Sequence, residues 1–573
     1  MMIMGRKLPF SILIILVFAS TIADYHLTTA KAIVLVEGHI TADTTWTPFN
    51  TYLVINNTYI DPNATLTIEP GVQVQFADNS SLIVEGSLFA FGTDAGPIVF
   101  EPSRVVEDPP EPYPGAWNTI CFKGNSSEQF LLEHAKVKYA VHGVTIESLD
   151  LATIKRSEIS NCSENGIMLI GESNVIIEEN TIKHNKNGIA TNQAEVLTGI
   201  IFNNNTISNN QENGVYLYGY SGYTGYFQWI YNVTFSHNTI SSNGKNGVYL
   251  YNAGGHIYNI TFFSNTISSN GKNGVFLYSY SSMYNVTFSS NIVTSNDENG
   301  IYTAAQRHHK QMFDLMMQDN IISANHQKGI WINGGINARL TNNSVSYNLF
   351  GVFYTRTSDN LAEYNDIYCN FYGMNVTLGA SVNAKRNYWG QPTGPYHPSW
   401  NSEGKGNPVN GDRTDLAFNP FLTSNQGHIN LRPHALLLAN TITVNFNETV
   451  IFDASGSADD GQIDYYYFDF GDGTKSGWIP QPVIAHKYTE EGKYNATLIV
   501  MDELGVTSLD GNAIYVTITV VPELPSPFIL QLFMITTILA VIIYIVNAHA
   551  NKTCHTVKPS RSRSNEQQHT QSK

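Results

Sequence analysis

An Asn-Gly motif that returns at irregular intervals constrains the fold of this chain more than any other feature. Its clearest copies begin at Asn180, Asn205, Asn238 and Asn265. The glycines that end neighbouring copies lie as close as 22 residues (Gly166 to Gly188) and as far as 33 residues (Gly214 to Gly247) apart. A minimum spacing with a variable excess indicates one fixed coil that carries loops inserted at its corners.

Each motif glycine is followed by a short stretch in which apolar residues alternate, as in Val215-Tyr-Leu-Tyr218. A period of two predicts a β-strand with Val215 and Leu217 inward and Tyr216 and Tyr218 outward. We expect the motif glycine to supply the positive φ of a sharp corner. Stacked coils then align equivalent residues in columns. The predicted core column is Ile182, Ile207, Ile240 and Ile267, and the predicted turn column is Asn185, Asn210, Asn243 and Asn270.

The predicted fold is therefore all-β, a right-handed parallel β-helix (solenoid) over residues 24–425. Parallel crossover connections are almost always right-handed, which sets the hand of the coil. A leucine-rich repeat has a similar repeat length, but it would need a helical half-repeat that the sequence lacks. Alternating runs over residues 64–76 and 81–92 are predicted to be the first coils, which cap the exposed end of the solenoid.

Four segments near the end of the array resemble the last coil of a known family. These are Asn387-Tyr-Trp-Gly390, Thr393-Gly-Pro395, Gly404-Lys-Gly406 and Asn419-Pro-Phe-Leu422. They are similar to the NosD-like, or carbohydrate-binding and sugar hydrolase, β-helix family, and the resemblance covers roughly residues 35–425. It implies the fold but not one ligand, because the family includes polysaccharide enzymes, copper-insertion factors and surface proteins.

Residues 431–521 lose the repeat and resemble a PKD domain. The similar segments are Val450-Ile-Phe-Asp-Ala-Ser-Gly-Ser457, Tyr467-Phe-Asp-Phe-Gly-Asp-Gly-Thr474, His486-Lys-Tyr488 and Tyr494–Asp502. The Asp-Gly turn predicts a hairpin, and about ninety residues of alternating strands suit a small immunoglobulin-like β-sandwich. Asp469 and Asp472 could ligate a cation, but carboxylates that shape a turn are the favoured interpretation.

Both ends carry targeting signals. Residues 1–23 have the layout of a signal peptide, with two basic residues, an apolar run and a small-residue cleavage region. A Pro-rich stem at 522–527 leads into an apolar run at 528–546, which is long enough for a transmembrane helix. The basic tail at 547–573 predicts a cytoplasmic C-terminus by the positive-inside rule. The chain is thus predicted to be a single-pass protein of the cell membrane with its N-terminal ectodomain outside.

Charge and cysteine content exclude several classes of function. A formal net charge of −16 argues against binding to nucleic acid, whose phosphates an acidic surface repels. The four cysteines show no paired spacing typical of a zinc site or a disulfide framework. Cys121, Cys162 and Cys369 are therefore predicted to be buried free thiols, with Cys554 in the tail. No cofactor and no metal site are predicted, and the copper role of NosD has no support beyond the resemblance.

No catalytic residues are predicted. The position two before the motif glycine holds residues of mixed charge, and no second acidic column accompanies them: Glu164, Lys186, Glu212, Lys245, Lys272 and Glu298. This pattern indicates a solvated edge. Glu178 and Glu179 are adjacent and should point to opposite faces of a strand. The most unusual cluster, Arg307-His-His-Lys310 with Asp314 and Asp319, lies in one enlarged coil.

Aromatic residues form the surface most suited to a ligand. One outward column should hold Tyr216, Tyr249, Phe276, Tyr302, Trp331 and Phe353, and the next should hold Tyr218, Tyr251 and Tyr278. Inserted corners add Tyr220, Tyr223, Tyr226, Phe227, Trp229 and Tyr231. Flat rings can stack on sugar faces, and soluble proteins seldom expose many rings without a partner. Alternatively, the inserted loops fold back over the rings and bury them.

Two functions remain open from the sequence. The favoured one is a non-enzymatic surface protein for adhesion, envelope structure or carbohydrate binding, with an extracellular polysaccharide, an envelope glycan or another surface protein as partner. The alternative is a surface-bound polysaccharide lyase or glycosidase. About a dozen Asn-x-Ser/Thr sites could carry glycans, among them Asn63, Asn232, Asn259, Asn285, Asn375 and Asn495.

Overall fold

The computed structural model describes residues 31–103, 112–123, 129–147, 151–171, 174–191, 196–219, 229–280, 282–305, 312–426, 433–459, 462–503, 505–508, 515–521, 537–539 and 541. The predicted signal peptide, stem and tail lie outside these ranges. Of the predicted span at 528–546, only 537–539 and 541 are described, and they are helical. Among the described residues, no helix has the length and apolar character needed to cross a membrane.

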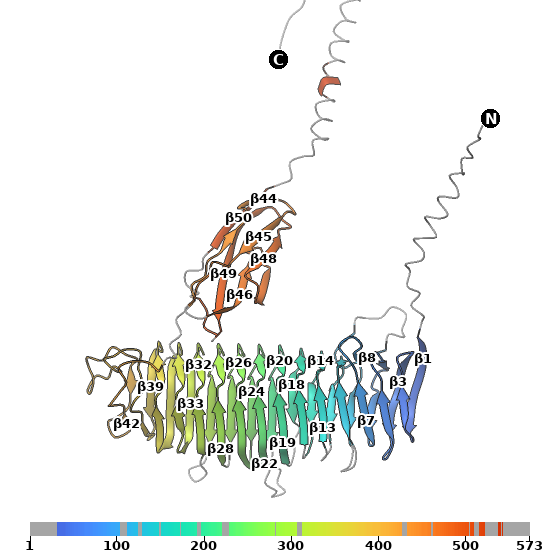
Figure 1. Ribbon diagram of the computed structural model, residues 1–573, viewed down its shortest axis with the longest axis horizontal. Helices are drawn as coiled ribbons and strands as arrows, with labels where there is room; N and C mark the ends of the chain where they lie inside the picture. The colour runs from blue at the N-terminus through green and yellow to red at the C-terminus, as the bar shows by residue number, and fades with distance from the viewer. Residues whose placement is uncertain are drawn as a thin grey trace, which may run out of the picture. The chain divides into compact units, whose positions relative to one another are not determined.

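The chain divides into two compact units. The first comprises Met1–Arg432 with Asp502–Val506, and the second comprises Pro433–Met501 with Thr507–Lys573. The first unit is a stack of parallel coils whose strands follow one another along its length (Figure 1). Its strands form three faces, because each coil contributes one strand to each face and each strand pairs with its equivalent in the next coil.

Face 1 contains β2 (Thr44–Trp46), β4 (Thr65–Ile68), β7 (Ser87–Phe91), β10 (Phe130–Glu133), β13 (Leu151–Lys155), β16 (Asn174–Glu178), β19 (Val196–Asn203), β22 (Trp229–Ser236), β25 (His256–Phe263), β28 (Met283–Ser289), β31 (Met312–Gln318), β34 (Arg339–Thr341), β37 (Asn360–Glu363), β40 (Val382–Asn383) and β42 (Leu416–Ala417). Face 2 contains β5 (Gln73–Phe76), β8 (Ile98–Pro102), β11 (Ala135–Lys138), β14 (Glu158–Ser160), β17 (Thr181–Lys183), β20 (Thr206–Ser208), β23 (Thr239–Ser241), β26 (Thr266–Ser268), β29 (Ile292–Thr294), β32 (Ile321–Ser323), β35 (Ser344–Ser346) and β38 (Asp366–Tyr368).

Face 3 contains β6 (Ser81–Val84), β9 (Thr119–Phe122), β12 (Val144–Ile146), β15 (Asn165–Leu169), β18 (Asn187–Thr191), β21 (Val215–Gly219), β24 (Val248–Asn252), β27 (Val275–Ser279), β30 (Ile301–Ala305), β33 (Lys328–Ile336), β36 (Phe350–Ser358), β39 (Tyr372–Thr377) and β41 (Val409–Asn410). The long strands β1 (Ala32–Ile40) and β3 (Asn50–Ile60) pair with each other over the first coil. The all-β solenoid predicted from the repeat is confirmed.

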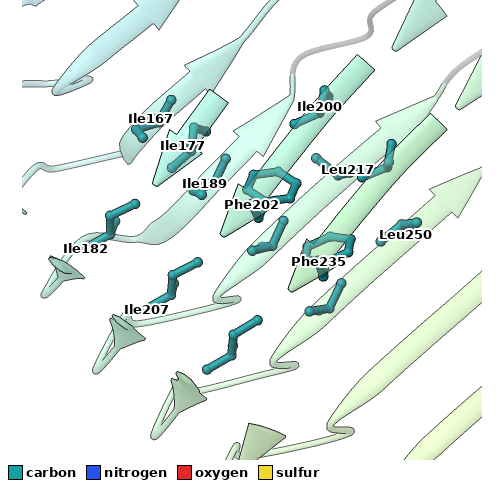
Figure 2. Packing of buried hydrophobic residues seen from close by; sticks show 14 of the residues in the cluster. Ile167, Ile177, Ile182, Ile189, Ile200, Phe202, Ile207, Leu217, Phe235 and Leu250 are labelled. Atoms are coloured by element: carbon teal, nitrogen blue, oxygen red, sulfur yellow. The ribbon is translucent and has the colours of Figure 1, made fainter. Parts of the chain in front are cut away.

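The core consists of columns of apolar side chains that point into the coil. Ile182 and Ile207 are fully buried on face 2, and Ile189 and Leu217 are fully buried on face 3 (Figure 2). On face 1, four phenylalanines stack with ring centroids 4.5–4.6 Å apart: Phe202, Phe235, Phe262 and Phe288. That distance is close to the spacing of paired strands, so the coil repeat itself brings equivalent rings into contact.

Asparagines form continuous ladders at the two corners that flank face 2, and all of them except Asn407 are buried. Ladder 1, between faces 1 and 2, runs through Asn180, Asn205, Asn238, Asn265, Asn291, Asn320, Asn343, Asn365 and Asn387. Ladder 2, between faces 2 and 3, runs through Asn185, Asn210, Asn243, Asn270, Asn296, Asn325, Asn348, Asn370 and Asn407. The predicted turn column is part of ladder 2 and is confirmed.

One ladder residue shows why an amide side chain can be buried here. The Nδ2 of Asn243 donates to the Ile207 carbonyl at 3.2 Å and to the Asn270 Oδ1 at 3.0 Å. Its Oδ1 accepts from both the backbone amide and the Nδ2 of Asn210, at 3.2 and 2.9 Å. All the hydrogen-bonding groups of the side chain are thus used, which removes the cost of burying them.

The motif glycines do not have the role predicted for them. Gly188, Gly214 and Gly247 lack a positive φ, which instead occurs at the residue before every ladder asparagine except Asn407, as at His184 and Asn209. The reason for glycine is close packing. A Cβ at Gly214 would lie 2.6 Å from the Gly247 carbonyl oxygen and 2.9 Å from the Asn243 Nδ2. The first motif glycine, Gly143, packs against Gly166 in the same way, so it belongs to the column.

The three corners differ in how much length they tolerate. The two ladders stay five residues apart in every coil from Asn180 and Asn185 to Asn365 and Asn370, so face 2 has a constant length. Within these coils, the extra residues lie instead between a face 3 strand and the next face 1 strand. Between β21 and β22 nine residues intervene, Tyr220 to Gln228, and they lie outside the described residues.

The second unit is a sandwich of two sheets. The smaller sheet contains β43 (Leu438–Ala439), β45 (Thr449–Asp453) and β48 (Val483–Lys487). The larger sheet contains β44 (Thr443–Asn445), β50 (Tyr515–Val521), β49 (Gly492–Asp502), β46 (Ile463–Asp469) and β47 (Lys475–Ile479). The predicted hairpin is the antiparallel β46–β47 pair, whose turn contains Gly471 and Gly473 at φ values of 80° and 91°.

The two aspartates of this hairpin have protein partners. The Asp472 carboxylate accepts from Thr474 at 2.6 Å and pairs with His486 at 2.8 Å. Asp469 pairs with Lys475 at 3.1 Å and accepts from the Gly471 amide. Both therefore act as turn-forming carboxylates, in agreement with the favoured interpretation.

One of the cysteine predictions is wrong. Cys121 and Cys162 are buried free thiols, but Cys369 is exposed. Cys369 is the residue before Asn370 of ladder 2 and has a φ of 53°, which places its side chain at a corner and outside the core. The position of Cys554 is outside the described residues.

Candidate ligand groove

Face 3 aligns the predicted aromatic residues in two columns. Strand register pairs Tyr216 with Tyr249, and the column continues through Phe276, Tyr302, Trp331 and Phe353. The neighbouring column pairs Tyr218, Tyr251 and Tyr278. We call the first the ring column. All of these side chains are half-buried, so the columns form as predicted, while the course of the loop residues Tyr220, Tyr223, Tyr226 and Phe227 lies outside the described residues.

We expected the rings of the ring column to offer flat faces to the solvent, but most of these faces are covered. Neighbouring centroids are 5.3 Å apart for Tyr216 and Tyr249, 5.0 Å for Tyr249 and Phe276, and 4.0 Å for Tyr302 and Trp331. From Tyr216 to Trp331 the neighbouring rings overlap face to face, with planes 1° to 25° apart, whereas Phe353 meets Trp331 edge-on at 76°. Tyr249, Phe276 and Tyr302 are each covered on both sides by stacked neighbours, which leaves ring edges and tyrosine hydroxyls for a ligand.

The tyrosine hydroxyls of the ring column stay protonated over a wide pH range. Burial raises the pKa of Tyr216 to about 12 and also raises the pKa values of Tyr249 and Tyr302. Nearby tyrosine hydroxyls add to the effect for Tyr216 and Tyr249. At neutral pH these groups are therefore uncharged and can both donate and accept hydrogen bonds.

A third asparagine ladder runs beside the ring column and was not predicted. Ladder 3 contains Asn165, Asn187, Asn213, Asn246, Asn273 and Asn299. Its direction is opposite to that of ladders 1 and 2, because Asn246 donates back to the preceding coil. The backbone amide and Nδ2 of Asn246 donate to the Asn213 Oδ1 at 3.2 and 3.0 Å, and the Asn246 Oδ1 accepts two bonds from Asn273.

The column of mixed charge stacks on the other side of ladder 3. Lys186 pairs with Glu164 at 2.6 Å, and Lys245 pairs with Glu212 at 3.0 Å. Backbone hydrogen bonds between consecutive members place Glu212, Lys245, Lys272 and Glu298 in four successive coils. The prediction of a solvated edge fits the exposure of Lys272 and the partial exposure of the others.

Together these three columns line one open groove of about 570 Å³. It extends over five coils, from Glu212, Asn213 and Tyr216 to Gln327 and Trp331. Charged residues form one rim, ladder 3 forms the floor, and the edges of the ring column form the other rim. With coils about 4.8 Å apart, the groove is about 19 Å long. A groove of this open, elongated shape can hold an extended ligand.

Lys328 follows Asn299 at the end of ladder 3, where its backbone amide donates to the Asn299 Oδ1 at 3.3 Å. Its ammonium lies 4.3 Å from the centre of the Trp331 ring, and 5.3 and 5.9 Å from the Phe353 and Phe350 rings. Burial lowers the pKa of Lys328, with Glu298 opposing the shift. This cation is therefore held by aromatic rings of its own chain, and the polar floor stops at Asn299.

Sequence reasoning missed a second ring ladder, on face 1. Tyr231 stacks on Tyr258 at 4.7 Å, and Tyr258 stacks on Tyr284 at 4.9 Å. Trp229 contacts this ladder edge-on. Each tyrosine directly precedes an exposed Asn-x-Thr site, which repeats at the same register and could have revealed the ladder. These three rings are not among the residues that line the groove beside the ring column.

Other candidate residues do not assemble a catalytic centre in the described ranges. The cluster at Arg307–Lys310 lies outside them, and Asp314 accepts a hydrogen bond from Asn337. Glu179 pairs with Arg156, which also contacts Glu133. Nowhere in the described parts of the chain do three or more His, Cys, Asp or Glu side chains form a group suited to a metal ion.

The candidate glycosylation sites differ in accessibility. Asn63, Asn232, Asn259, Asn285 and Asn495 are exposed, whereas Asn375 is buried. Asn232, Asn259 and Asn285 are equivalent residues of three successive coils, linked by hydrogen bonds of 3.0 and 2.7 Å.

Three family profiles match the chain. Residues 118–312 match the family described as "Right handed beta helix region", and residues 218–407 match "Periplasmic copper-binding protein (NosD)". Residues 430–518 match "PKD domain". These matches confirm the resemblance to a NosD-like β-helix and a PKD domain that the sequence motifs indicated.

Individual proteins are similar to shorter or more distant parts. A stretch of 95 residues is 34% identical to Collagenase ColA of Clostridium perfringens (strain 13 / Type A), and it covers 16% of this chain but only 8% of the collagenase. A structure from a study of "the promiscuous specificity of the carbohydrate-binding modules from the beta-sandwich super family" is 38% identical, with a TM-score of 0.15, and the match covers 17% of this chain and 36% of that one. The mannuronan C-5 epimerase AlgE6 A-module of Azotobacter vinelandii is 14% identical over 64% of this chain and 91% of its own, with a TM-score of 0.36.

Proposed function

Because the chain is a right-handed β-helix with a NosD region and a PKD domain, we propose that it is a non-enzymatic cell-surface protein that binds carbohydrate along the groove of face 3. The groove carries this proposal. It is open, it runs along the coil stack, and its length suits a chain of several sugar units. Amide, ammonium, carboxylate and phenol groups offer hydrogen bonds along its whole course.

The chemistry of the groove fits a glycan better than a peptide or a lipid. Sugar hydroxyls both donate and accept, and the neutral tyrosine hydroxyls and ladder amides can match them. Ring edges give apolar contact between the polar groups without a continuous apolar face of the kind that would hold a lipid.

A glycosidase or lyase is the alternative, and the groove favours binding without cleavage. Glycosidases need two carboxyl groups about 5 to 9.5 Å apart. The two glutamates of the groove, Glu212 and Glu298, lie three coils apart, which corresponds to about 14 Å along the axis. The lysines of the two intervening coils, Lys245 and Lys272, separate them.

The ends of the chain support a place at the cell membrane. A signal peptide at 1–23 would export the ectodomain, and a helix at 528–546 would anchor it with the basic tail inside the cell. The β-helix and the PKD domain would then lie outside, where polysaccharides occur. Protease protection of the tail in intact cells tests this topology, and a tail that is cleaved from outside would contradict it.

The test of carbohydrate binding compares two matched triple variants. Tyr216, Tyr249 and Phe276 are replaced by Ser in one variant, and Tyr231, Tyr258 and Tyr284 are replaced by Ser in the other. Both remove three stacked rings from successive coils, so they perturb the fold to a similar degree. We expect only the first variant to lose binding on a glycan array, with the circular dichroism of both unchanged.

A product assay on the bound glycans separates the two functions. Binding with unchanged chain length supports the proposal, whereas shortened or unsaturated oligosaccharides support the enzyme. Equal glycan binding by the first triple variant and the wild-type chain would show that the groove is not the binding site.

A further inference from the structure

The charged rim of the groove has an ordered pattern. From one end to the other it presents Glu212, Lys245, Lys272 and Glu298, one from each of four successive coils. Two cations therefore lie side by side in the centre, with one carboxylate on each outer side. Outside the groove the same column continues as the ion pair of Lys186 and Glu164.

The two central lysines are not equivalent. Lys245 is already paired with Glu212 at 3.0 Å. Lys272 is exposed and makes no ion pair within 4.0 Å in the described part of the chain, and the neighbouring Glu298 is within hydrogen-bonding reach of the Asn273 amide instead, at 3.4 Å. One positive charge thus remains available at the middle of the groove.

In the asparagine floor beneath these lysines, the acceptor oxygens already have hydrogen-bond partners, but one N–H donor does not within the described ranges. The Oδ1 atoms of Asn213 and Asn246 each accept two hydrogen bonds from the next coil. The Nδ2 of Asn246 has two hydrogens but donates only one hydrogen bond among the described residues, to Asn213. Asn246 is 5% exposed, so its second N–H is a buried donor that lines the groove. A ligand atom that accepts a hydrogen bond would satisfy it.

The opposite direction of ladder 3 creates this donor. In ladder 2 the Nδ2 of Asn243 uses both hydrogens, one on the Ile207 carbonyl and one on Asn270. In ladder 3 the Asn246 side chain lies at the start of face 3, on the outer side of the coil, and makes only the bond to Asn213. The same residue type is therefore structural in one ladder and available to a ligand in the other.

We propose that the centre of the groove is a subsite for one anionic group, a carboxylate or a sulfate, carried by the glycan. Lys272 supplies the charge, and the free N–H of Asn246 supplies a buried donor. Tyr249, the ring of the same coil as Asn246, also lines the groove. The outer carboxylates Glu212 and Glu298 disfavour further anionic groups on both sides, so the preferred glycan has spaced charges.

This inference rests on the proposed carbohydrate binding and names the ligand class. The test uses the full chain and three hexasaccharides of equal length. Hyaluronan hexasaccharide carries only carboxylates, carboxyl-reduced chondroitin sulfate hexasaccharide carries only sulfates, and carboxyl-reduced hyaluronan hexasaccharide carries neither. Binding is measured by calorimetry at low ionic strength, because salt screens an exposed lysine. Free glucuronate and inorganic sulfate are the control ligands, because each presents the anionic group without a longer glycan chain.

Wild-type protein is expected to bind at least one acidic hexasaccharide more tightly than the uncharged one. Lys272→Gln should reduce that preference about fivefold, and Lys272→Glu should abolish it. Lys186→Gln is the matched control, since it changes the same column outside the groove and should leave the preference intact. Asn246→Asp, which removes the donor and adds a negative charge, should weaken binding of the acidic ligands further.

Each outcome decides between the two proposals. Equal binding of acidic and uncharged hexasaccharides overturns the anion subsite but leaves carbohydrate binding in place. Tight binding of free glucuronate or sulfate without any gain from the hexasaccharides supports the subsite and contradicts the glycan groove. Absence of binding to every ligand overturns both, and a preference that survives Lys272→Glu overturns the assignment to Lys272.

Discussion

The β-helix and the PKD sandwich both have polar side chains at their turns, but they satisfy them differently. In the β-helix, Asn243 is bonded to equivalent asparagines in the coils before and after it. In the sandwich, Asp472 is satisfied within one hairpin and its neighbour, by Thr474 and His486. In a ladder, each asparagine is hydrogen-bonded to the coils on both sides, whereas the turn carboxylate of the sandwich bonds only within its own turn and to one neighbouring strand. Damage to a column should therefore spread to both adjacent coils, and damage to the sandwich turn should stay local.

The largest effect is expected from a motif glycine. Gly214→Ala places a Cβ 2.6 Å from the Gly247 carbonyl oxygen and 2.8 Å from the Ile240 side chain, and backbone cannot give way easily. We expect a loss of about 3 kcal/mol in the free energy of unfolding of the β-helix. Gly219→Ala in the same coil is the control. Its Cβ would meet only the Asn252 side chain, at 3.3 Å, so a loss below about 1 kcal/mol is expected in denaturant unfolding. Equal losses would contradict the close-packing role.

The next effect concerns the ladder itself. Asn243→Ala removes a side chain that joins three coils and leaves buried partners on Asn210 and Ile207 without their bonds. We expect a loss of about 2 kcal/mol, together with faster amide hydrogen exchange in the coils on both sides. Gln211→Ala, at an exposed position of the same corner, should change neither quantity. Exchange that rises in one coil alone would show that the ladder does not couple its neighbours.

A smaller effect is expected from pH in the sandwich. Burial works to raise the pKa of Asp472, but hydrogen bonds from Thr474 and His486 outweigh it, and the pKa lies below its usual value of 3.8. A lowered carboxyl pKa stabilises the fold above the unfolded pKa, and this stabilisation is lost as pH falls through the folded pKa. The PKD transition in calorimetry should therefore weaken below about pH 4. Asp472→Asn should flatten that dependence, and an unchanged slope would refute the assignment.

The last effect is expected only at high pH, from the ring column. Tyr216 holds its proton to about pH 12 in the fold, while a tyrosine in the unfolded chain ionises near 10. The folded state therefore binds more protons between these values, and stability should fall as pH rises from 10 to 12. Phenolate absorbance should show a late-titrating group that is missing in Tyr216→Phe. A titration curve identical to that of the variant would mean that Tyr216 is not shielded.

The architecture could be predicted from the sequence because every coil has the same arrangement of strands and corners. Period two placed Val215 and Leu217 inside, and the constant register placed Tyr216 above its equivalents in later coils. The role of Gly214 could not be predicted in this way, since a clash with the next coil depends on the distance between two backbones. Likewise, the corner that exposes Cys369 depends on a left-handed residue that the sequence does not mark.

The groove was only partly predictable. Its rings and its charged rim follow from register alone, and both were found. The donor character of its floor depends on the direction of the hydrogen bonds in ladder 3, which asparagine identity does not reveal. The orientation of the rings also required the structure, because the same column could present either faces or edges. The second ring ladder at Tyr231 was missed because its strands β22, β25 and β28 do not follow the motif glycines.

The unequal corners have an evolutionary consequence. Insertions between a face 3 strand and the following face 1 strand leave the spacing of ladders 1 and 2 unchanged, so a loop can lengthen without shifting any column. Segments such as the one between β21 and β22 directly follow the strands that carry the ring column. Selection can therefore vary the chemistry at that margin coil by coil while the scaffold stays fixed. New binding specificities can therefore arise by local insertion at this corner, without a change in the columns that stabilise the fold.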